Sequence, residues 1–366
     1  MAGKKLKRIS FTVVNDLSYD QRMHRICGTL SLAGYSVTLI GRRLPDSKAL
    51  PELPFTCVRL PFFFRSGKAF YLELQFRLFW YLLFHRFDVY GAIDLDTALP
   101  NLLVAKLKGK KWVYDAHEYF TEVPEVVDRP AVQKVWLWIE KFCIPKADLA
   151  YTVSAGLADL FEKRYGKQFA VIRNLPSRMP WSGIQKEEPP FILYQGALNE
   201  GRCLEMLLPA IKGLPLQLRI AGEGDLSVAL RQLCRDLGME EQVKFLGYQS
   251  PGELQHLTPR AWLGFNVLEN RGLSYYHSLS NKCFDYLQAG VPCMCSPFPE
   301  YLLLAQEYPA LIFAAAHSEE IRLVITQLIE HPEIYQQLAE ACIPAAQNLN
   351  WESEEPILLD LYEKQV

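Results

Sequence analysis

The segment GALNEGRCLEML combines a basic residue with small, turn-forming residues directly after an apolar strand. The strand ends at Gly196, and the sequence predicts a helix that begins near Arg202. The first turn of a helix offers unpaired backbone amides and a partial positive charge, and the guanidinium of Arg202 adds a fork of donors that matches a phosphate. The segment favours a diphosphate site, although an ordinary solvated loop with an exposed arginine has the same local pattern.

Two later segments add groups of the same kind. Gly222 and Glu223 follow another strand, which predicts either a tight turn or a close approach of the backbone to a ligand. Lys282 lies in the first turn of a further predicted helix, and Asp285 lies about one turn later. Lys282 and the amides of the preceding loop suit a phosphate, and Asp285 suits ribose hydroxyls. A solvated helical pair is the alternative for these two residues.

A histidine stands between carboxylates in the first half of the chain. Asp115, His117 and Glu118 occur together in YDAHEYF, at the end of a predicted strand. A histidine beside a strand end is more often structural, but imidazole changes charge near neutral pH and flanking carboxylates shift its pKa. His117 is therefore the first candidate among the titratable groups.

These residues require a scaffold that brings strand ends together, and the alternation of elements in the first half predicts one. Helices are expected through Leu32 and at about 69–84, 99–107 and 132–142. Such βαβ units predict a doubly wound α/β fold with a parallel sheet, whose loops gather at the carboxyl ends of the strands. The predicted strands are 9–14, 36–41, 55–61, 88–94, 111–117, 149–154 and 170–174.

The alternation restarts after a proline-rich polar stretch at 176–190, which is predicted to be a linker. The second set of predicted strands is 191–196, 216–222, 242–248, 261–268, 291–296 and 310–315. We therefore expect one domain at 1–175 and a second at 191–350. The amphipathic helix at 351–366 is expected to cross back to the first domain.

Composition limits the class of protein. The 366 residues are 50% hydrophobic and 22% charged, which is typical of globular proteins, and the length predicts two domains. A net charge of −2 gives no field that would gather nucleic acid, so no nucleic-acid partner is expected. The nine cysteines include no CxxC pair, and Cys293 and Cys295 suit neither a zinc knuckle nor a tight disulfide, so reduced thiols are expected. The basic start leads into a short strand rather than a signal peptide, which predicts a cytoplasmic protein.

The segment PFFFRSGKAFYLELQFRLFWYLLFHRF is apolar, aromatic and basic at once. Glu73, Gln75 and Arg77 interrupt it, so it is too short to span a membrane, and a buried core helix is the plainer interpretation. The alternative is a peripheral contact of residues 62–68 with an anionic membrane surface, such as the inner face of the cell membrane. The contacting side chains would be Phe62, Phe63, Phe64, Arg65 and Lys68.

In order and spacing, the segments at the strand ends resemble those of glycosyltransferase family 4. The likeness is carried by YQGALNEGR, LRIAGEGDL, VKFLGY and NKCFDYLQAGVP, with support from YTVSAGL, VIRN and the closing WESEEPILLDLY. It covers nearly the whole chain and implies the GT-B fold, in which two Rossmann-like domains face a central cleft. It also implies retaining transfer of a sugar from a nucleotide diphosphate donor that the second domain binds, without a metal or other cofactor.

The family's motifs imply roles for individual residues. Arg202 matches the basic residue that binds the donor diphosphate, and Asp285 matches the second acid of an E-x7-E motif that holds the ribose. His117 matches the active-site histidine of the first domain, and Lys282 lies in an NK-x-x-D/E variant of the helix start. His117, Arg202 and Lys282 are thus the catalytic candidates. The donor-binding candidates are Gly196, Arg202, Gly222, Glu223, Gly247, Tyr248, His277, Asn281, Lys282 and Asp285.

Three positions depart from the family pattern. His277 replaces the first acid of E-x7-E, Ala197 replaces a common arginine, and NDLSYDQR replaces a glycine-rich loop after the first strand. The second change leaves the diphosphate charge to Arg202 and Lys282. The third indicates an unusual acceptor side.

The remaining acidic and polar residues bear on the acceptor side and on metal binding. The polar residues after the first strand fit either a helix cap or contacts to an acceptor. Asp94 and Asp96 form a DxD, which holds a divalent metal in other glycosyltransferases, but the pattern is common by chance and no metal is expected. The acceptor-side candidates are Asn15, Asp16, Asp20, Arg22 and Glu118.

The sequence therefore predicts a hexosyltransferase-type enzyme that transfers a sugar to a saccharide or lipid-linked acceptor in cell-envelope polysaccharide or glycolipid synthesis. A sugar-nucleotide epimerase of GT-B fold is one alternative, and a non-catalytic two-lobed binding protein is another, which His277 and Ala197 keep open. A dehydrogenase is not expected, because no strand is followed by the full glycine fingerprint.

Overall fold

The computed structural model describes residues 6–18, 20–45, 47–179 and 186–366. The chain forms two compact units, Met1–Asn174 with Glu354–Val366, and Leu175–Ser353. Of the expected linker at 176–190, residues 180–185 lie outside the described residues, and the remainder belongs to the second unit.

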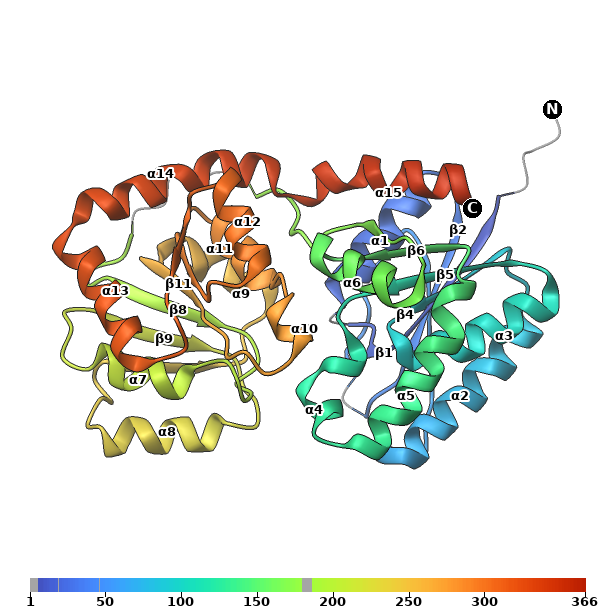
Figure 1. Cartoon of the computed structure of the whole chain (residues 1–366), viewed down its shortest axis with the longest axis horizontal. Helices are drawn as coiled ribbons and strands as arrows, with labels where there is room; N and C mark the ends of the chain where they lie inside the picture. The colour runs from blue at the N-terminus through green and yellow to red at the C-terminus, as the bar shows by residue number, and fades with distance from the viewer. Residues whose placement is uncertain (1–5, 19, 46, 180–185) are drawn as a thin grey trace. The chain divides into compact units, whose positions relative to one another are not determined.

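The first unit is built on a seven-stranded sheet in which every pair of neighbours is parallel (Figure 1). The strand order is β3-β2-β1-β4-β5-β6-β7, so the order reverses at β1 and the sheet is doubly wound. The strands are β1 (Arg8–Asp16), β2 (Ser36–Arg42), β3 (Thr56–Leu60), β4 (Val89–Ile93), β5 (Lys111–Ala116), β6 (Leu149–Thr152) and β7 (Ala170–Val171).

Helices connect these strands and cover the sheet. Helices α2, α3 and α5 pack side by side, and their buried residues share one apolar core with Tyr90, Trp112 and Tyr114 of the sheet. The helices of this unit are α1 (Gln21–Leu32), α2 (Gly67–Phe84), α3 (Ala98–Lys108), α4 (Pro124–Val127), α5 (Pro130–Cys143), α6 (Ala155–Tyr165) and the C-terminal α15 (Trp351–Gln365).

The C-terminal helix returns to the first unit, as predicted. Tyr362 packs its ring against Phe11 of β1 at 6.4 Å, and its hydroxyl lies 3.1 Å from that of Tyr151 on β6. Thr29 of α1 donates a hydrogen bond to Glu355 at 2.7 Å. Because all these partners lie in the first half of the chain, the last helix completes the first unit.

The second unit repeats the design with six parallel strands in the order β10-β9-β8-β11-β12-β13. The strands are β8 (Phe191–Gln195), β9 (Gln217–Ala221), β10 (Val243–Gly247), β11 (Leu263–Asn266), β12 (Cys293–Cys295) and β13 (Leu311–Phe313). The helices are α7 (Leu204–Ile211), α8 (Ser227–Asp236), α9 (Pro251–Leu257), α10 (Leu273–Tyr276), α11 (Asn281–Gln288), α12 (Pro299–Glu307), α13 (Ser318–Glu330) and α14 (Pro332–Asn348). Both sheets agree with the α/β architecture that the sequence predicts.

Helix α2 is apolar on two opposite sides. Its buried stripe is Phe70, Leu74, Leu78 and Leu82, and a second apolar stripe, Leu72, Phe76, Trp80 and Phe84, is exposed. The two stripes are offset by two residues, or about 200° around a helix. The expected core helix is thus buried on one side only. None of the helices within the described residues has the length and apolar character needed to cross a bilayer.

Candidate functional site

The loops that carry the predicted donor-binding residues meet where the order of the second sheet reverses. Strand β8 lies between β9 on one side and β11 on the other. In a doubly wound sheet, the loops at the carboxyl ends of the strands separate at this reversal and leave room for a ligand. The loop from Gly196 to Cys203 follows β8, and the chain after β11 leads to the start of α11.

Glycine brings two of these loops into contact. The Gly196 amide donates to the Ala221 carbonyl at 2.9 Å, and a Cβ on Gly222 would lie 1.9 Å from the Gly196 oxygen. Gly196 and Gly222 have φ of +135° and +152°, which L side chains rarely adopt. A Cβ on Gly196 would lie 3.5 Å from Nζ of Lys282, so the open side of this glycine faces the lysine.

Two cations, Lys282 and Arg202, lie beside this backbone. Lys282 Nζ lies 5.4 Å from the ring centre of Tyr194, and Arg202 Cζ lies 4.9 Å from that of Tyr275. Burial, and next the positive charge of Arg202, lower the pKa of Lys282 to about 7. The buried Nε of Arg202 has no hydrogen-bond partner, and neither cation forms an ion pair within the described part of the chain. Two cations that repel each other in this way favour a bound anion.

Asp285 and the end of β8 hold the lysine's helix in place. Gln195 donates to Asp285 at 3.2 Å and accepts from Thr258 at 2.8 Å. The Tyr286 hydroxyl accepts from the Gln195 amide at 3.1 Å and donates to the Leu193 carbonyl at 2.9 Å. Helix α11 is thereby fixed against β8, which sets the position of Lys282 in its first turn.

Glu223, Gly247 and Tyr248 lie along the edge next to β9 and β10. Glu223 forms an exposed ion pair with Arg231 at 2.8 Å, and a Cβ on Gly247 would lie 3.6 Å from its carboxylate. Tyr248 is exposed. The structure thus groups these three residues with one another.

His277 and Asn281 flank the lysine along the chain. His277 ends the short helix α10 and packs half-buried against the Tyr276 ring at 5.1 Å. Asn281 is exposed as the first residue of α11. Their donor roles stay predictions.

His117 in the first unit is held between two carboxylates. Its Nε2 lies 3.1 Å from Asp115 Oδ2, its Nδ1 lies 3.7 Å from Asp94 Oδ2, and its amide donates to Asp94 Oδ1 at 2.8 Å. Burial alone would lower the pKa of His117, but the two carboxylates outweigh it and raise the pKa to about 9. With 22% of its side chain exposed, His117 presents a cationic imidazolium to solvent at neutral pH.

Asp94 adopts a strained backbone conformation to reach this histidine. Its φ of 56° and ψ of 175° fall in a region that almost only glycine occupies, at a cost of about 1–3 kcal/mol. Such strain persists where the surrounding contacts fix it, and it often occurs at functional sites. In the sequence Asp94 is recognisable only as half of a DxD, and no local pattern indicates its contact with His117.

Arg22 corrects an expectation on the acceptor side. It is 3% exposed, and its Nη2 and Nε lie 2.9 and 3.3 Å from the two oxygens of Asp115. Its Nη1 donates to the Ile172 carbonyl at 3.0 Å. Arg22 therefore orients Asp115, which in turn orients His117, and its guanidinium is too buried to meet an acceptor.

The other acceptor-side candidates divide into structural and exposed groups. Asp20 accepts from the Met23 amide at 3.1 Å, so it caps α1 as the alternative interpretation had it. Asp16 is 7% exposed and pairs with Arg59 at 3.1 Å. Asn15 and Glu118 are exposed.

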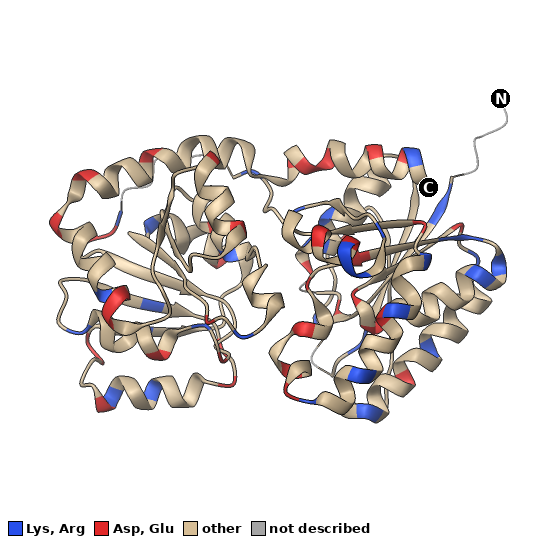
Figure 2. Cartoon of the chain, viewed as in Figure 1, with Lys and Arg blue, Asp and Glu red and all other residues tan. Residues whose placement is uncertain are grey.

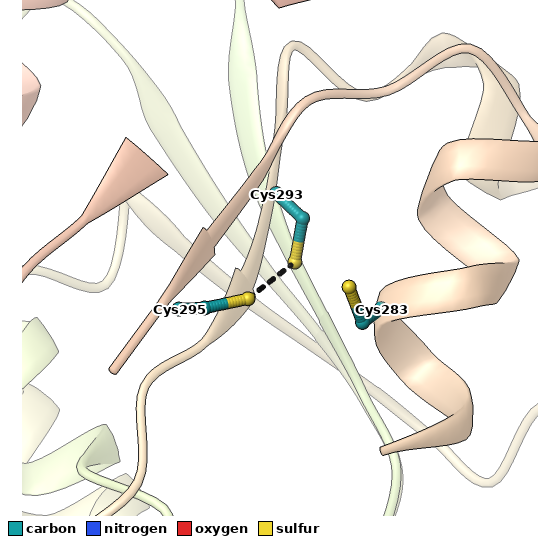
Figure 3. A group of neighbouring side chains, drawn as sticks. All are labelled: Cys283, Cys293 and Cys295. Carbon is teal, nitrogen blue, oxygen red and sulfur yellow. Dashed lines mark hydrogen bonds between the residues drawn. The ribbon is translucent and has the colours of Figure 1, made fainter. Parts of the chain in front are cut away.

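One group of side chains in the described residues is compact enough to hold a metal, and its first member, Cys283, directly follows Lys282 in α11. The Sγ atoms of Cys283, Cys293 and Cys295 all lie within 4.8 Å of one another, between α11 and β12 (Figure 3). All three are buried in the apolar core of the unit, and all nine cysteines are free thiols. The sequence places Cys293 and Cys295 on one strand, but no pattern in it indicates that Cys283 lies beside them. Asp94 and Asp96 belong to no such group among the residues that the structure describes.

Residues 178–348 match the family Glycosyl transferases group 1, and residues 21–175 match Glycosyltransferase Family 4. No curated protein sequence matches the chain.

Solved structures share the fold of the whole chain at low sequence identity. Sucrose-phosphate synthase from Thermosynechococcus elongatus has a TM-score of 0.79 at 14% identity, with 98% of each chain covered. HepE of Anabaena, in complex with UDP-glucose, has a TM-score of 0.75 at 12% identity, covering 98% of this chain and 99% of its own. WaaG, a glycosyltransferase involved in lipopolysaccharide biosynthesis, has a TM-score of 0.73 at 15% identity, covering 96% and 99%. With two family matches that follow each other along nearly the whole chain, this protein belongs to the family 4-like glycosyltransferases of GT-B fold.

Proposed function

We propose that the second unit binds the diphosphate of a nucleotide-sugar donor at the loops after β8 and at the start of α11. The observation that carries the proposal is the pair of cations Arg202 and Lys282 beside the glycine backbone at residue 196, which form no ion pair within the residues that the structure describes. The Anabaena protein HepE was solved with UDP-glucose, which supports a nucleotide-sugar ligand for this fold.

Breaking the bond between sugar and diphosphate builds negative charge on the leaving oxygen. Cations and amides that already point at that oxygen stabilise the transition state without further reorganisation. Arg202 contributes a fork of donors, and Lys282 contributes a point charge. Because the pKa of Lys282 is about 7 in the free protein, we expect the diphosphate to bring the lysine back to its protonated form.

His117 is proposed to act as an imidazolium toward the transferred sugar or the acceptor. Asp115 holds Nε2, and both carboxylates keep the ring charged, so this histidine suits charge stabilisation, or hydrogen-bond donation through Nδ1, better than proton abstraction. The transfer is proposed to retain the anomeric configuration, with the acceptor attacking from the face that the diphosphate leaves and the diphosphate taking up the acceptor proton. No metal is proposed to take part.

The experiment is incubation of the purified protein with UDP, GDP, ADP, TDP and CDP sugars, with and without short saccharides and lipid-linked sugars. Release of one diphosphate and a product with the donor's anomeric configuration, undiminished by EDTA, supports the proposal. Conversion of the donor sugar without any acceptor identifies an epimerase. Turnover of none of the donors indicates a binding protein.

We further propose that the first unit contacts an anionic membrane, through residues 62–68 and the adjoining layer of α2, α3 and α5. Phe63 and Phe64 are exposed, and so are Arg65 and Lys68. The large hydrophobic side chains exposed on the three helices are Leu72, Phe76, Trp80, Phe84, Leu103, Leu107, Val135 and Trp138. An exposed apolar surface of this extent calls for a partner.

Charge on the same three helices favours an anionic lipid surface. Their basic residues are Lys68, Arg77, Lys106, Lys108, Lys134 and Lys141 (Figure 2). Their acids are Glu140, which is buried, and Glu73, which pairs with Arg77 at 2.6 Å. Aromatic side chains with cations around them bind at the interface of a bilayer. Such a location would bring the enzyme to a lipid-linked acceptor.

Flotation with phosphatidylcholine vesicles, with and without phosphatidylglycerol, tests this contact. The variant Phe76→Ser/Trp80→Ser/Phe84→Ser should stay in solution while the wild type floats with the anionic vesicles. The control Val228→Ser/Leu302→Ser/Leu303→Ser removes exposed apolar side chains from the second unit and should float normally. Equal flotation of all three proteins would show that the three helices do not take part in the membrane contact.

A further inference from the structure

A small basic pocket lies at the carboxyl ends of β2 and β3 in the first unit. Its volume is about 340 Å³, and it is lined by Arg42, Arg43, Leu44, Pro45, Pro61, Phe62, Phe63 and Arg65. The two strands pair to their last residues, Arg42 and Leu60, and the Arg43 amide extends the ladder by donating to the Leu60 carbonyl at 2.9 Å. The pocket therefore forms at the edge of the sheet where parallel strands present their ligand-binding loops.

Three guanidinium groups line the pocket, and its lining residues among those that the structure describes include no carboxylate. None of Arg42, Arg43 and Arg65 forms an ion pair with an acid within the described ranges. Like charges in one small pocket repel each other, and an anion between them would remove that repulsion.

Contacts with α2 hold the pocket in shape. Arg42 donates to the Arg65 carbonyl at 2.7 Å, and its guanidinium lies 4.4 Å from the ring centre of Phe70. The amides of Phe63 and Phe64 both donate to the Glu73 carboxylate at 3.0 Å. The loop that carries Arg65 is thereby tied to the helix through two adjacent amides of its aromatic run and through the Arg65 carbonyl, so the three guanidinium groups line a formed pocket.

We propose that this pocket binds the phosphate group of the acceptor. The inference deepens the proposed transferase function. The binding of a phosphate follows from the pocket alone, and the identification of the ligand as the acceptor rests on the proposed function. Guanidinium forks match the geometry of phosphate oxygens and bind them bidentately. Phe62 and Phe63 supply an apolar wall beside the charged groups, which suits a ligand that joins a phosphate to a hydrocarbon part.

The phosphate could belong to a lipid headgroup or to a free phosphorylated sugar, and the test separates these sources. The ligands are phosphatidylcholine vesicles with and without phosphatidic acid, soluble dihexanoyl phosphatidic acid, and inorganic phosphate. Binding is measured for the wild type and for Arg43→Ala/Arg65→Ala, which replaces two exposed side chains. The control Arg129→Ala/Lys163→Ala removes the same charge from exposed positions elsewhere in the unit.

The alanine variant should bind its phosphate ligand about 10-fold or more weakly, since it loses charge-assisted hydrogen bonds, and the control should bind as the wild type does. Arg43→Lys/Arg65→Lys keeps the charge but loses the forks, so it should also bind several-fold more weakly. Response to phosphatidic acid alone identifies a lipid headgroup, and equal response to inorganic phosphate identifies a free phosphate. Equal affinity of the alanine variant and the wild type for every phosphate, or equal loss in the control, would overturn the proposal.

Lys282→Met separates this pocket from the donor site. If Lys282→Met loses phosphate binding, that binding belongs to the donor site. If Lys282→Met keeps phosphate binding and Arg43→Ala/Arg65→Ala loses it, the binding belongs to the pocket. Nucleoside diphosphate binding should be unchanged in the pocket variants. If the proposed donor site is wrong, the wild type will bind no nucleotide, and this result does not depend on whether the pocket binds phosphate.

Discussion

Lys282 gives the sharpest consequence of the proposed donor site, because its charge depends on whether a ligand is bound. Burial and the neighbouring Arg202 lower its pKa from 10.5 to about 7. At pH 8 about nine in ten lysines with this pKa are neutral. If the diphosphate restores the charged form, each binding event takes up about 0.9 proton at pH 8 and about 0.1 at pH 6.

Titration calorimetry in two buffers with different ionisation enthalpies measures this uptake. The cognate nucleoside diphosphate should show it at pH 8 with the wild type. Lys282→Met should bind at least about 10-fold more weakly, without the uptake. Binding by the wild type with no proton uptake, or equal uptake by both proteins, would refute the assignment of the lysine to the diphosphate.

The same shift makes a prediction about stability. The folded-state pKa lies below that of the unfolded chain, so the unfolded chain binds more protons between pH 7 and pH 10.5. Stability therefore rises with pH in this window, and the penalty, at most about 5 kcal/mol, is complete below pH 7. Denaturant unfolding should show Lys282→Met to be more stable than the wild type at pH 6, with the difference shrinking by about 3 kcal/mol at pH 9.5. A difference that does not change with pH would contradict the buried, discharged lysine.

The remaining predictions concern three other residues. Arg202→Ala should lower kcat/KM by about 100-fold, or roughly 2.7 kcal/mol at the transition state, and steady-state kinetics at wild-type rates would exclude the residue. His117 has a folded-state pKa raised from 6.5 to about 9, so the stability it contributes is full below pH 6.5 and is lost as pH rises through 9. His117→Asn should remove this dependence from unfolding curves between pH 6 and pH 10, and an unchanged curve would contradict the ion pairs. Gly222→Ala should abolish nucleotide binding, because its Cβ would collide with Gly196, whereas Gly252→Ala, with open space around it, should bind normally in the same titration.

The alternation of elements could be predicted because it depends on local patterns. Apolar strands followed by amphipathic helices mark βαβ units, and the parallel rule then places Gly196 and the start of α11 on one edge. The encounter of Lys282 with Gly196, which are 86 positions apart by subtraction of their numbers, thus followed from the fold class.

Contacts that depend on side-chain packing could not be predicted. From its place after the first strand, Arg22 fits a helix cap or an acceptor contact, and its pairing with Asp115 could not be predicted because Asp115 lies on another strand and no local pattern links the two. Asp94 matched a motif by chance, and its contact with His117 depends on a strained backbone that sequence does not reveal. Tyr275, which lies against Arg202, had no signal beyond its place in a polar loop. The sequence patterns predict none of the helices α12, α13 and α14, and Pro344 within α14 argues locally against a helix there.

The central claim is that the second unit binds a nucleoside diphosphate through Arg202 and Lys282. Thermal unfolding with UDP, GDP, ADP, TDP and CDP, for the wild type and for Arg202→Ala/Lys282→Met, tests it most directly. One nucleotide at 100 times its Kd should stabilise the wild type by about 2.7 kcal/mol and leave the double variant unchanged. A wild type that responds to none of the five, or a double variant that responds equally, would contradict the claim.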